Sequence, residues 1–131
     1  MKKTLAVCLL LLLPLAVGCG QNYGTLLEFN GGELYYTSSV TEDDATRLGQ
    51  YLVSGGFFDG DRKSVQLTMA GSTYQFRMVI KEGLENDQEY VQIAKQFNRE
   101  LSVSVFGGKQ VDIHFCNEQL KTIRVIRATG P

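Results

Sequence analysis

A unit of one helix followed by two strands, present twice in the chain, is the feature that most constrains the fold. In the first copy, a helical pattern over residues 41–54 precedes Phe57-Phe58 and two alternating strands; in the second, a helical pattern over residues 87–105 precedes Phe106 and two more. The two copies align at an offset of about 46 residues. This pattern is typical of an internal αββ duplication, with a chance likeness of two such units as the alternative.

An opening hairpin precedes both copies. Residues 25–29 and 33–37 flank Asn30-Gly31-Gly32, a turn sequence whose residues tolerate positive φ. The complete order is therefore β-β-α-β-β-α-β-β. Because short connections favour antiparallel neighbours, we expect an antiparallel sheet. The alternation in each strand leaves one face of that sheet apolar, so both helices should pack on the same face of an α+β domain.

Each helix has an apolar stripe, and the first has clear boundary signals. Thr41 can cap the first amides of that helix, and Gly55-Gly56 can end it. For the second helix, the residues expected to face the sheet recur at helical spacing: Tyr90, Ala94, Phe97, Leu101 and Val105. We also expect Phe57 and Phe58, which follow the first helix, to fold back into the core.

The start of the chain has the pattern of a secretory signal peptide. Lys2 and Lys3 precede an apolar stretch from Leu5 to Val17, which is too short for a membrane-spanning helix. The exit, Leu15-Ala16-Val17-Gly18-Cys19, resembles the lipobox of bacterial lipoproteins. That resemblance implies that residues 1–18 are removed and that Cys19 carries acyl chains such as palmitate. An ordinary cleaved signal peptide is the alternative.

The lipobox resemblance implies a place in the cell envelope, with the membrane as the first partner. Residues 19–24 would then be the lipidated cysteine and a short tether, and residues 25–131 a single α+β domain. Gly20 stands where an aspartate retains such proteins on the inner membrane of well-studied Gram-negative bacteria. In a Gram-negative host we therefore expect the outer membrane; the sequence leaves the host open.

Length, charge and cysteine content exclude several classes of protein. Removing residues 1–18 from the 131-residue chain leaves 113 residues, enough for one domain. All 14 acidic residues lie after Cys19, whereas Lys2 and Lys3 would leave with the signal peptide, so the mature net charge is −3. A mildly acidic domain without a basic run is a poor nucleic-acid binder. Cys116 remains as a lone thiol, so no internal disulfide is expected.

The strand alternation also predicts which polar side chains share the open face of the sheet. Arg77, Arg124, Asp112 and His114 are the candidate binding residues on that face. Arginine suits carboxylate ligands and is frequent in protein interfaces. The alternative is an ordinary solvated sheet face. The other residues expected there are Gln66, Thr68, Gln75, Cys116 and Thr122.

The segment Asp112-x-His114-x-Cys116 is the sharpest local cluster of chemically active residues. Alternate strand positions about 6.6 Å apart suit a shared metal poorly, and the sequence offers no evident fourth ligand. We therefore predict no metal and no cofactor. A Cys116/His114 nucleophile pair lacks a glycine-rich elbow or oxyanion loop, so no catalytic residue is assigned.

Three function classes follow from these observations. We expect a lipid-anchored, non-enzymatic binding or interaction module that contacts another envelope protein. The alternatives are a small envelope hydrolase or transferase using Cys116 and His114, and a structural subunit of an envelope assembly. The mature domain resembles a recurrent bacterial envelope domain of uncharacterised function, through residues 33–37, 56–60 and 73–77. That resemblance implies no activity.

Overall fold

The computed structural model describes residues 22–128 of the chain. Residues 1–21, which include the predicted signal peptide and Cys19, lie outside the described residues, as do residues 129–131. The elements follow the expected order, with one added 3-10 helix. They are β1 (Thr25–Phe29), β2 (Gly32–Tyr36), α2 (Glu42–Ser54), β3 (Ser64–Ala70), β4 (Thr73–Val79), η1 (Leu84–Asn86), α3 (Gln88–Ser104), β5 (Val111–Cys116) and β6 (Thr122–Ile126).

Local sequence signals explain where these elements begin. The Thr41 side chain accepts a hydrogen bond from the Asp44 amide at 3.1 Å, and the Asp87 side chain accepts one from the Glu89 amide at 2.9 Å. Both are N-caps that satisfy amides the helix itself leaves free. In the β1–β2 turn, Asn30 and Gly31 have φ of 46° and 84°. Such positive values match the twist of a tight hairpin.

The six strands lie in sequence order across one mixed sheet. Each hairpin is antiparallel, but β2 pairs with β3 and β4 with β5 in parallel. The expectation of an antiparallel sheet is therefore wrong for two of the five pairings. The rule of short connections holds within each hairpin. Between hairpins, however, α2 and α3 carry the chain back along the sheet before the next strand begins, and such crossovers produce parallel neighbours.

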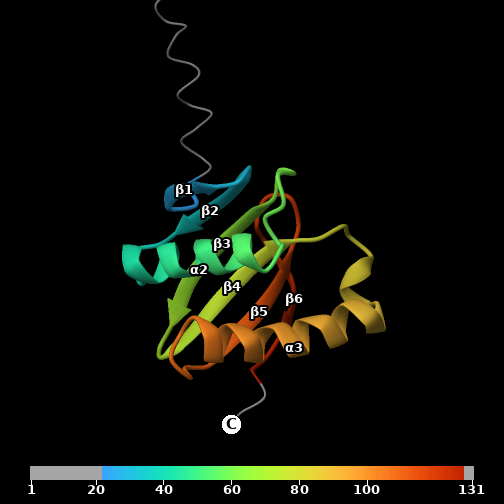
Figure 1. Ribbon diagram of the computed structural model, residues 1–131. Coiled ribbons are helices and arrows are strands. Elements are labelled where there is room, and N and C mark those ends of the chain that lie inside the picture. The colour runs from blue at the N-terminus through green and yellow to red at the C-terminus, as the bar shows by residue number, and fades with distance from the viewer. Residues whose placement is uncertain (1–21, 129–131) are drawn as a thin grey trace, which may run out of the picture.

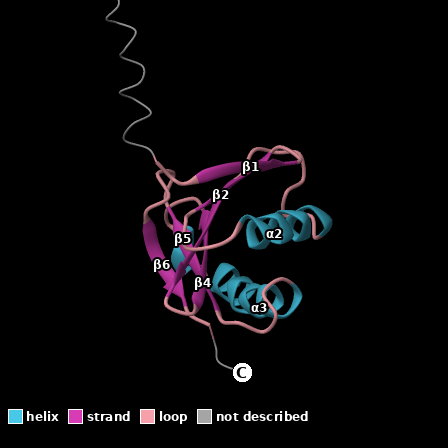
Figure 2. Ribbon diagram, turned by 90° about the vertical axis from the view of Figure 1, so that its left-hand side faces the viewer, coloured by secondary structure: helices cyan, strands magenta, loops and turns pink. Residues whose placement is uncertain are grey.

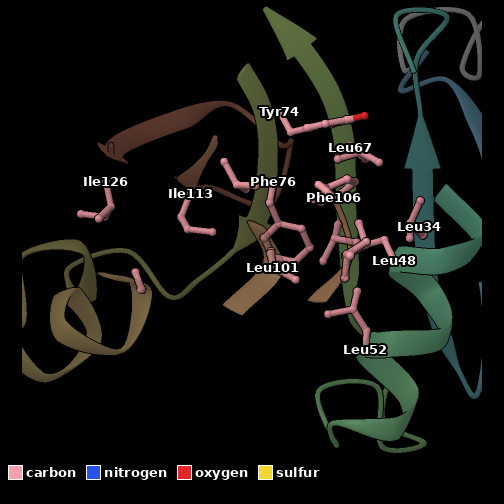
Figure 3. Close-up of a cluster of buried hydrophobic side chains, with 14 of the residues drawn as sticks. Leu34, Leu48, Leu52, Leu67, Tyr74, Phe76, Leu101, Phe106, Ile113 and Ile126 are labelled. Atoms are coloured by element: carbon pink, nitrogen blue, oxygen red, sulfur yellow. The ribbon is translucent and has the colours of Figure 1, made fainter. Parts of the chain in front are cut away.

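The sheet and both helices form two layers. Figure 2 shows α2 and α3 on the same side of the sheet, as expected from the strand alternation. Leu34, Leu67, Phe76 and Ile113 point from neighbouring strands toward the helices and are fully buried, and Leu48 of α2 packs with them (Figure 3). Because this core lies within residues 22–128, the domain contains its own main stabilising contacts.

The glycines Gly49 and Gly32 permit close packing against aromatic rings. An ideal Cβ at Gly49 would lie 2.1 Å from the Phe29 ring, so α2 rests directly on that ring of β1. An ideal Cβ at Gly32 would lie 2.2 Å from the ring of Phe58, which is buried as expected. These two contacts fix the edge hairpin to the helical layer. Among the described residues, no helix has the length and apolarity needed to cross a membrane.

Candidate functional site

Three of the four predicted binding residues share the open face of the sheet. Arg77 lies opposite His114 in the parallel β4–β5 register, and Gln75 lies opposite Asp112. The side chains of Arg77, His114, Gln75 and Asp112 therefore point away from the helices. The face is less open than expected at β5, since Asp112 and His114 expose only 7% and 8% of their surface.

Arg124 lies on the other face, which corrects the prediction for this residue. It pairs with Phe115, a core residue, because a β-bulge interrupts the β5–β6 register between Phe115 and Cys116. The bulge leaves Ile123 as an extra residue on β6 and reverses the expected facing beyond it. The Arg124 guanidinium donates to the Glu85 carbonyl at 3.2 Å and to the Asn86 side chain at 2.9 Å. Arg124 therefore holds η1 against the sheet.

Arg77 and His114 form an internal network beneath the β5–β6 loop. The Arg77 guanidinium reaches His114 Nδ1 at 3.2 Å and donates to the Leu120 carbonyl at 2.6 Å. The Thr122 hydroxyl also lies 2.9 Å from His114 Nδ1. Because a guanidinium only donates, Nδ1 must accept, and the neutral ring carries its proton on Nε2. Both Nε2 of His114 and Nε of Arg77 are buried without a hydrogen-bond partner among the described residues.

Burial makes His114 a poor proton carrier at neutral pH. Loss of solvent lowers the pKa of its imidazole to about 4, and the positive charge of Arg77 acts in the same direction. The ring is therefore neutral at pH 7. A general acid or base working near neutral pH needs a pKa close to that pH.

Cys116 is a buried structural thiol. Its exposed fraction is 0%, and burial raises the pKa of the thiol. Its Sγ donates to the His114 carbonyl at 3.6 Å. Since the thiolate is the nucleophilic form, these conditions oppose nucleophilic chemistry at Cys116. Across residues 22–128, no three His, Cys, Asp or Glu side chains gather closely enough to hold a metal ion.

Asp112 fastens the last described residues to the sheet. One carboxylate oxygen accepts from the Ala128 amide at 2.7 Å, and the other lies 3.4 Å from the Arg127 guanidinium. The polar residues predicted as a binding platform thus hold the β5–β6 loop and the chain beyond β6. Their hydrogen bonds are directed largely into the protein.

A groove of about 680 Å³ lies at the end of the sheet where three connections meet. We call it the loop groove. In Figure 1, the green connection from α2 to β3, the yellow connection after β4 and the red β5–β6 turn gather at that end. Its apolar lining comes from the first two connections and from the ends of β4 and α3. These residues are Phe57, Met78, Val79, Ile80, Leu84 and Tyr90.

Three cationic side chains and one acid form the charged part of the described lining of the loop groove. Arg62 pairs with Glu33 at 3.0 Å, and Lys63 pairs with Asp59 at 2.8 Å. Lys81 makes no ion pair within the described part of the chain. Glu118 is the only acidic residue that residues 22–128 contribute to the lining. The Lys63 ammonium lies 6.0 Å from the centre of the Phe57 ring, so a positive charge lies beside the apolar lining of the groove.

The loop groove was missed at the level of sequence. The expectation that Phe57 folds into the core is half right, because its ring packs against Phe76 and Phe97 yet stays half-buried at the groove. The adjacent Arg62-Lys63 was the one available signal. Lys81 and Leu84 join these residues only through tertiary packing, which no spacing in the sequence reveals.

The fold and this site define a small α+β domain with an end groove. The family model AF_1994_N, described as a family N-terminal domain, matches residues 26–127. The chain therefore belongs to that family. No curated protein and no solved structure matches the chain.

Proposed function

We propose that this protein is a lipid-anchored component of the bacterial envelope whose domain is a non-enzymatic binding module. The loop groove is the observation that carries the binding role. It combines an accessible apolar floor with cations at its rim, and its volume falls within the range of about 300–1,000 Å³ typical of ligand sites. In a Gram-negative host, the outer membrane would be its location.

The start of the domain supports an attachment close to the membrane. The Tyr23 carbonyl accepts a hydrogen bond from the Gln66 side chain at 2.7 Å, and the Tyr23 ring packs edge-on against Tyr35 at 5.3 Å. The chain is therefore fixed to the sheet four residues after Cys19. At about 3.3–3.6 Å per residue, a lipid on Cys19 would hold this point within about 14 Å of the anchor.

Binding is favoured over a hydrolase or transferase by the state of the only thiol–imidazole pair among residues 22–128. Cys116 is buried with a raised thiol pKa, and His114 is neutral and held by Arg77. The loop groove also replaces the open sheet face as the favoured binding surface. Arg77, Asp112 and His114 use their polar atoms mainly within the protein, whereas Lys81 and the groove floor are accessible.

The structural-subunit alternative has one observation in its favour. Strand β1 is an edge strand that pairs only with β2 among the described residues, and its Leu26 is 40% exposed. An edge strand of this kind can accept a strand from another protein. The charged residue Glu28 on the same strand opposes indiscriminate pairing.

Acyl labelling and crosslinking in intact cells test the proposed function. Cells expressing the full chain are fed an alkyne-tagged palmitate, and Cys19→Ser should abolish both labelling and membrane retention. A photo-reactive residue at Gln119, beside the groove, should crosslink to an envelope component in wild type and lose that product in Lys81→Glu. The matched charge reversal Lys109→Glu, at the opposite end of the sheet, should retain it. Labelling that survives Cys19→Ser, or equal crosslinking in all variants, would contradict the proposal.

A further inference from the structure

The floor of the loop groove exposes apolar surface that the domain core does not cover. Phe57, Met78, Val79 and Leu84 are all only half-buried, in contrast to the buried side chains deeper in the sheet. Removing such surface from water stabilises a complex by roughly 25 cal/mol per Å². The floor therefore suits a hydrocarbon segment of a ligand.

The cations beside that floor remain available for an anionic group. The Arg62 side chain is 78% exposed and that of Lys63 is 34% exposed in their ion pairs. One member of each pair, Arg62 or Asp59, is open to solvent that screens the attraction, so a ligand anion can share either cation at small cost. Lys81 needs no such exchange, because it has no ion-pair partner among residues 22–128.

The charge of the groove changes along its length. A second hollow of about 550 Å³ adjoins it and shares Lys81 and Glu118, while Glu82 adds a further carboxylate there. The cations Arg62 and Lys63 line the loop groove but not this second hollow. An anionic head would therefore be held near Lys81 on the side of Arg62 and Lys63, away from Glu118 at the boundary of the two hollows and from Glu82 beyond it.

From these features we propose that the loop groove binds a single-chain anionic lipid. Its acyl chain would lie on Phe57, Met78 and Leu84, with its carboxylate or phosphate near Lys81. This inference rests on the proposed function and assigns a ligand class to the same site. An acidic peptide would use the cations but would leave the apolar floor less completely covered.

Calorimetric titration of residues 22–131 tests the ligand class, since the described core lies within this part of the chain. Laurate and monododecyl phosphate are titrated below their aggregation concentrations, with dodecylammonium as the cationic control of equal chain length. We expect either anion to bind and dodecylammonium to bind at least about tenfold more weakly. Preference between the two anions identifies the headgroup. Equal binding of all three amphiphiles, or of none, would overturn the inference.

Three variants locate the site. Lys81→Glu should weaken binding of the anions by about tenfold, whereas Lys109→Glu should leave it unchanged. Leu84→Asn should weaken binding by a similar factor, with circular dichroism and the unfolding midpoint confirming that the domain still folds. Unchanged affinity in Lys81→Glu would overturn the inference, as would tighter binding of a Glu/Phe peptide than of laurate. If laurate fails to bind while the Gln119 crosslink still depends on Lys81, the binding-module proposal stands and only the ligand class fails.

Discussion

The pKa of a buried imidazole beside a guanidinium shifts in a predictable direction. His114 accepts from Arg77 through Nδ1, and its environment also includes Asp112 and Arg127. Burial and Arg77 depress the folded-state pKa to about 4, against an ordinary value of 6.5 in the unfolded chain. Between those pH values the unfolded state binds more protons. The free energy of unfolding must therefore fall as pH decreases from 6.5 toward 4.

The His114→Asn variant isolates this effect. Asparagine keeps an acceptor near the position of Nδ1 and removes the titration. From pH 7 to pH 4.5, wild type should lose about 2 kcal/mol more unfolding free energy than the variant, since each pKa unit corresponds to about 1.4 kcal/mol. Urea unfolding at both pH values measures the difference. Equal losses in both proteins would show that His114 is not buried as the neutral form.

Arg124 gives a second prediction at the scale of single residues. Its guanidinium holds the Glu85 carbonyl and the Asn86 side chain, and Leu84 of the same 3-10 helix lines the loop groove. Arg124→Met keeps much of the apolar stem and removes both contacts. Amide hydrogen exchange in residues 84–87 should become about tenfold faster, while exchange in β3 and β4 stays unchanged. Acceleration throughout the sheet would indicate a global rather than a local role.

At the level of elements, the contact between α2 and β1 depends on a missing side chain. Replacing glycine by alanine within a helix usually stabilises it by about 1 kcal/mol. At Gly49 the added Cβ would approach the Phe29 ring to 2.1 Å, so that ring must move. We expect Gly49→Ala to lower the unfolding free energy by about 1–3 kcal/mol instead, the usual cost of overpacking.

A double-mutant cycle separates this clash from other effects. Phe29→Leu shortens the opposing side chain, so the Gly49→Ala/Phe29→Leu variant should lose less unfolding free energy than the sum of the two single variants. Exposed Gln50 provides the control, because Gln50→Ala changes the same helix without touching β1. Strict additivity in the cycle would mean that the two side chains do not share one contact.

Elements with strong local signals were predictable from sequence. How these elements face and pair with one another was not. In β3, the alternation of Val65, Leu67 and Met69 in the sequence indicates both the strand and its core face. In α3, however, Tyr90 is 40% exposed and Asn98 is buried, with its amide donating to the Arg127 carbonyl at 3.2 Å. The side of α3 that is buried depends on where the sheet contacts this helix, and this contact exposes Tyr90 and buries Asn98. Likewise, the β-bulge that places Arg124 on the core face depends on the pairing between β5 and β6. The sequence of β6 alone does not indicate that pairing.

For the whole molecule, three antiparallel hairpins stand side by side, and helices on one face link each to the next. The α2-β3-β4 and α3-β5-β6 units have the same topology, which is consistent with the proposed duplication. Two such links must carry the chain to the far end of the sheet before it re-enters. Each link therefore has one turn at each end of the sheet. The turns at residues 55–63 and 80–87 lie at the same end as the β5–β6 turn, and the loop groove forms there, in a place that no single unit contains.

The hydrogen bond from Gln66 to the Tyr23 carbonyl has a consequence for how this protein would meet its ligand. If Cys19 is acylated as proposed, the three residues between it and Tyr23 would be too short for the domain to search the aqueous space above the bilayer. It would travel by lateral diffusion in the leaflet, and its encounters would become two-dimensional. A lipid that seldom leaves the bilayer would then be more accessible to the groove than any solute of equal affinity dissolved beyond the reach of the tether.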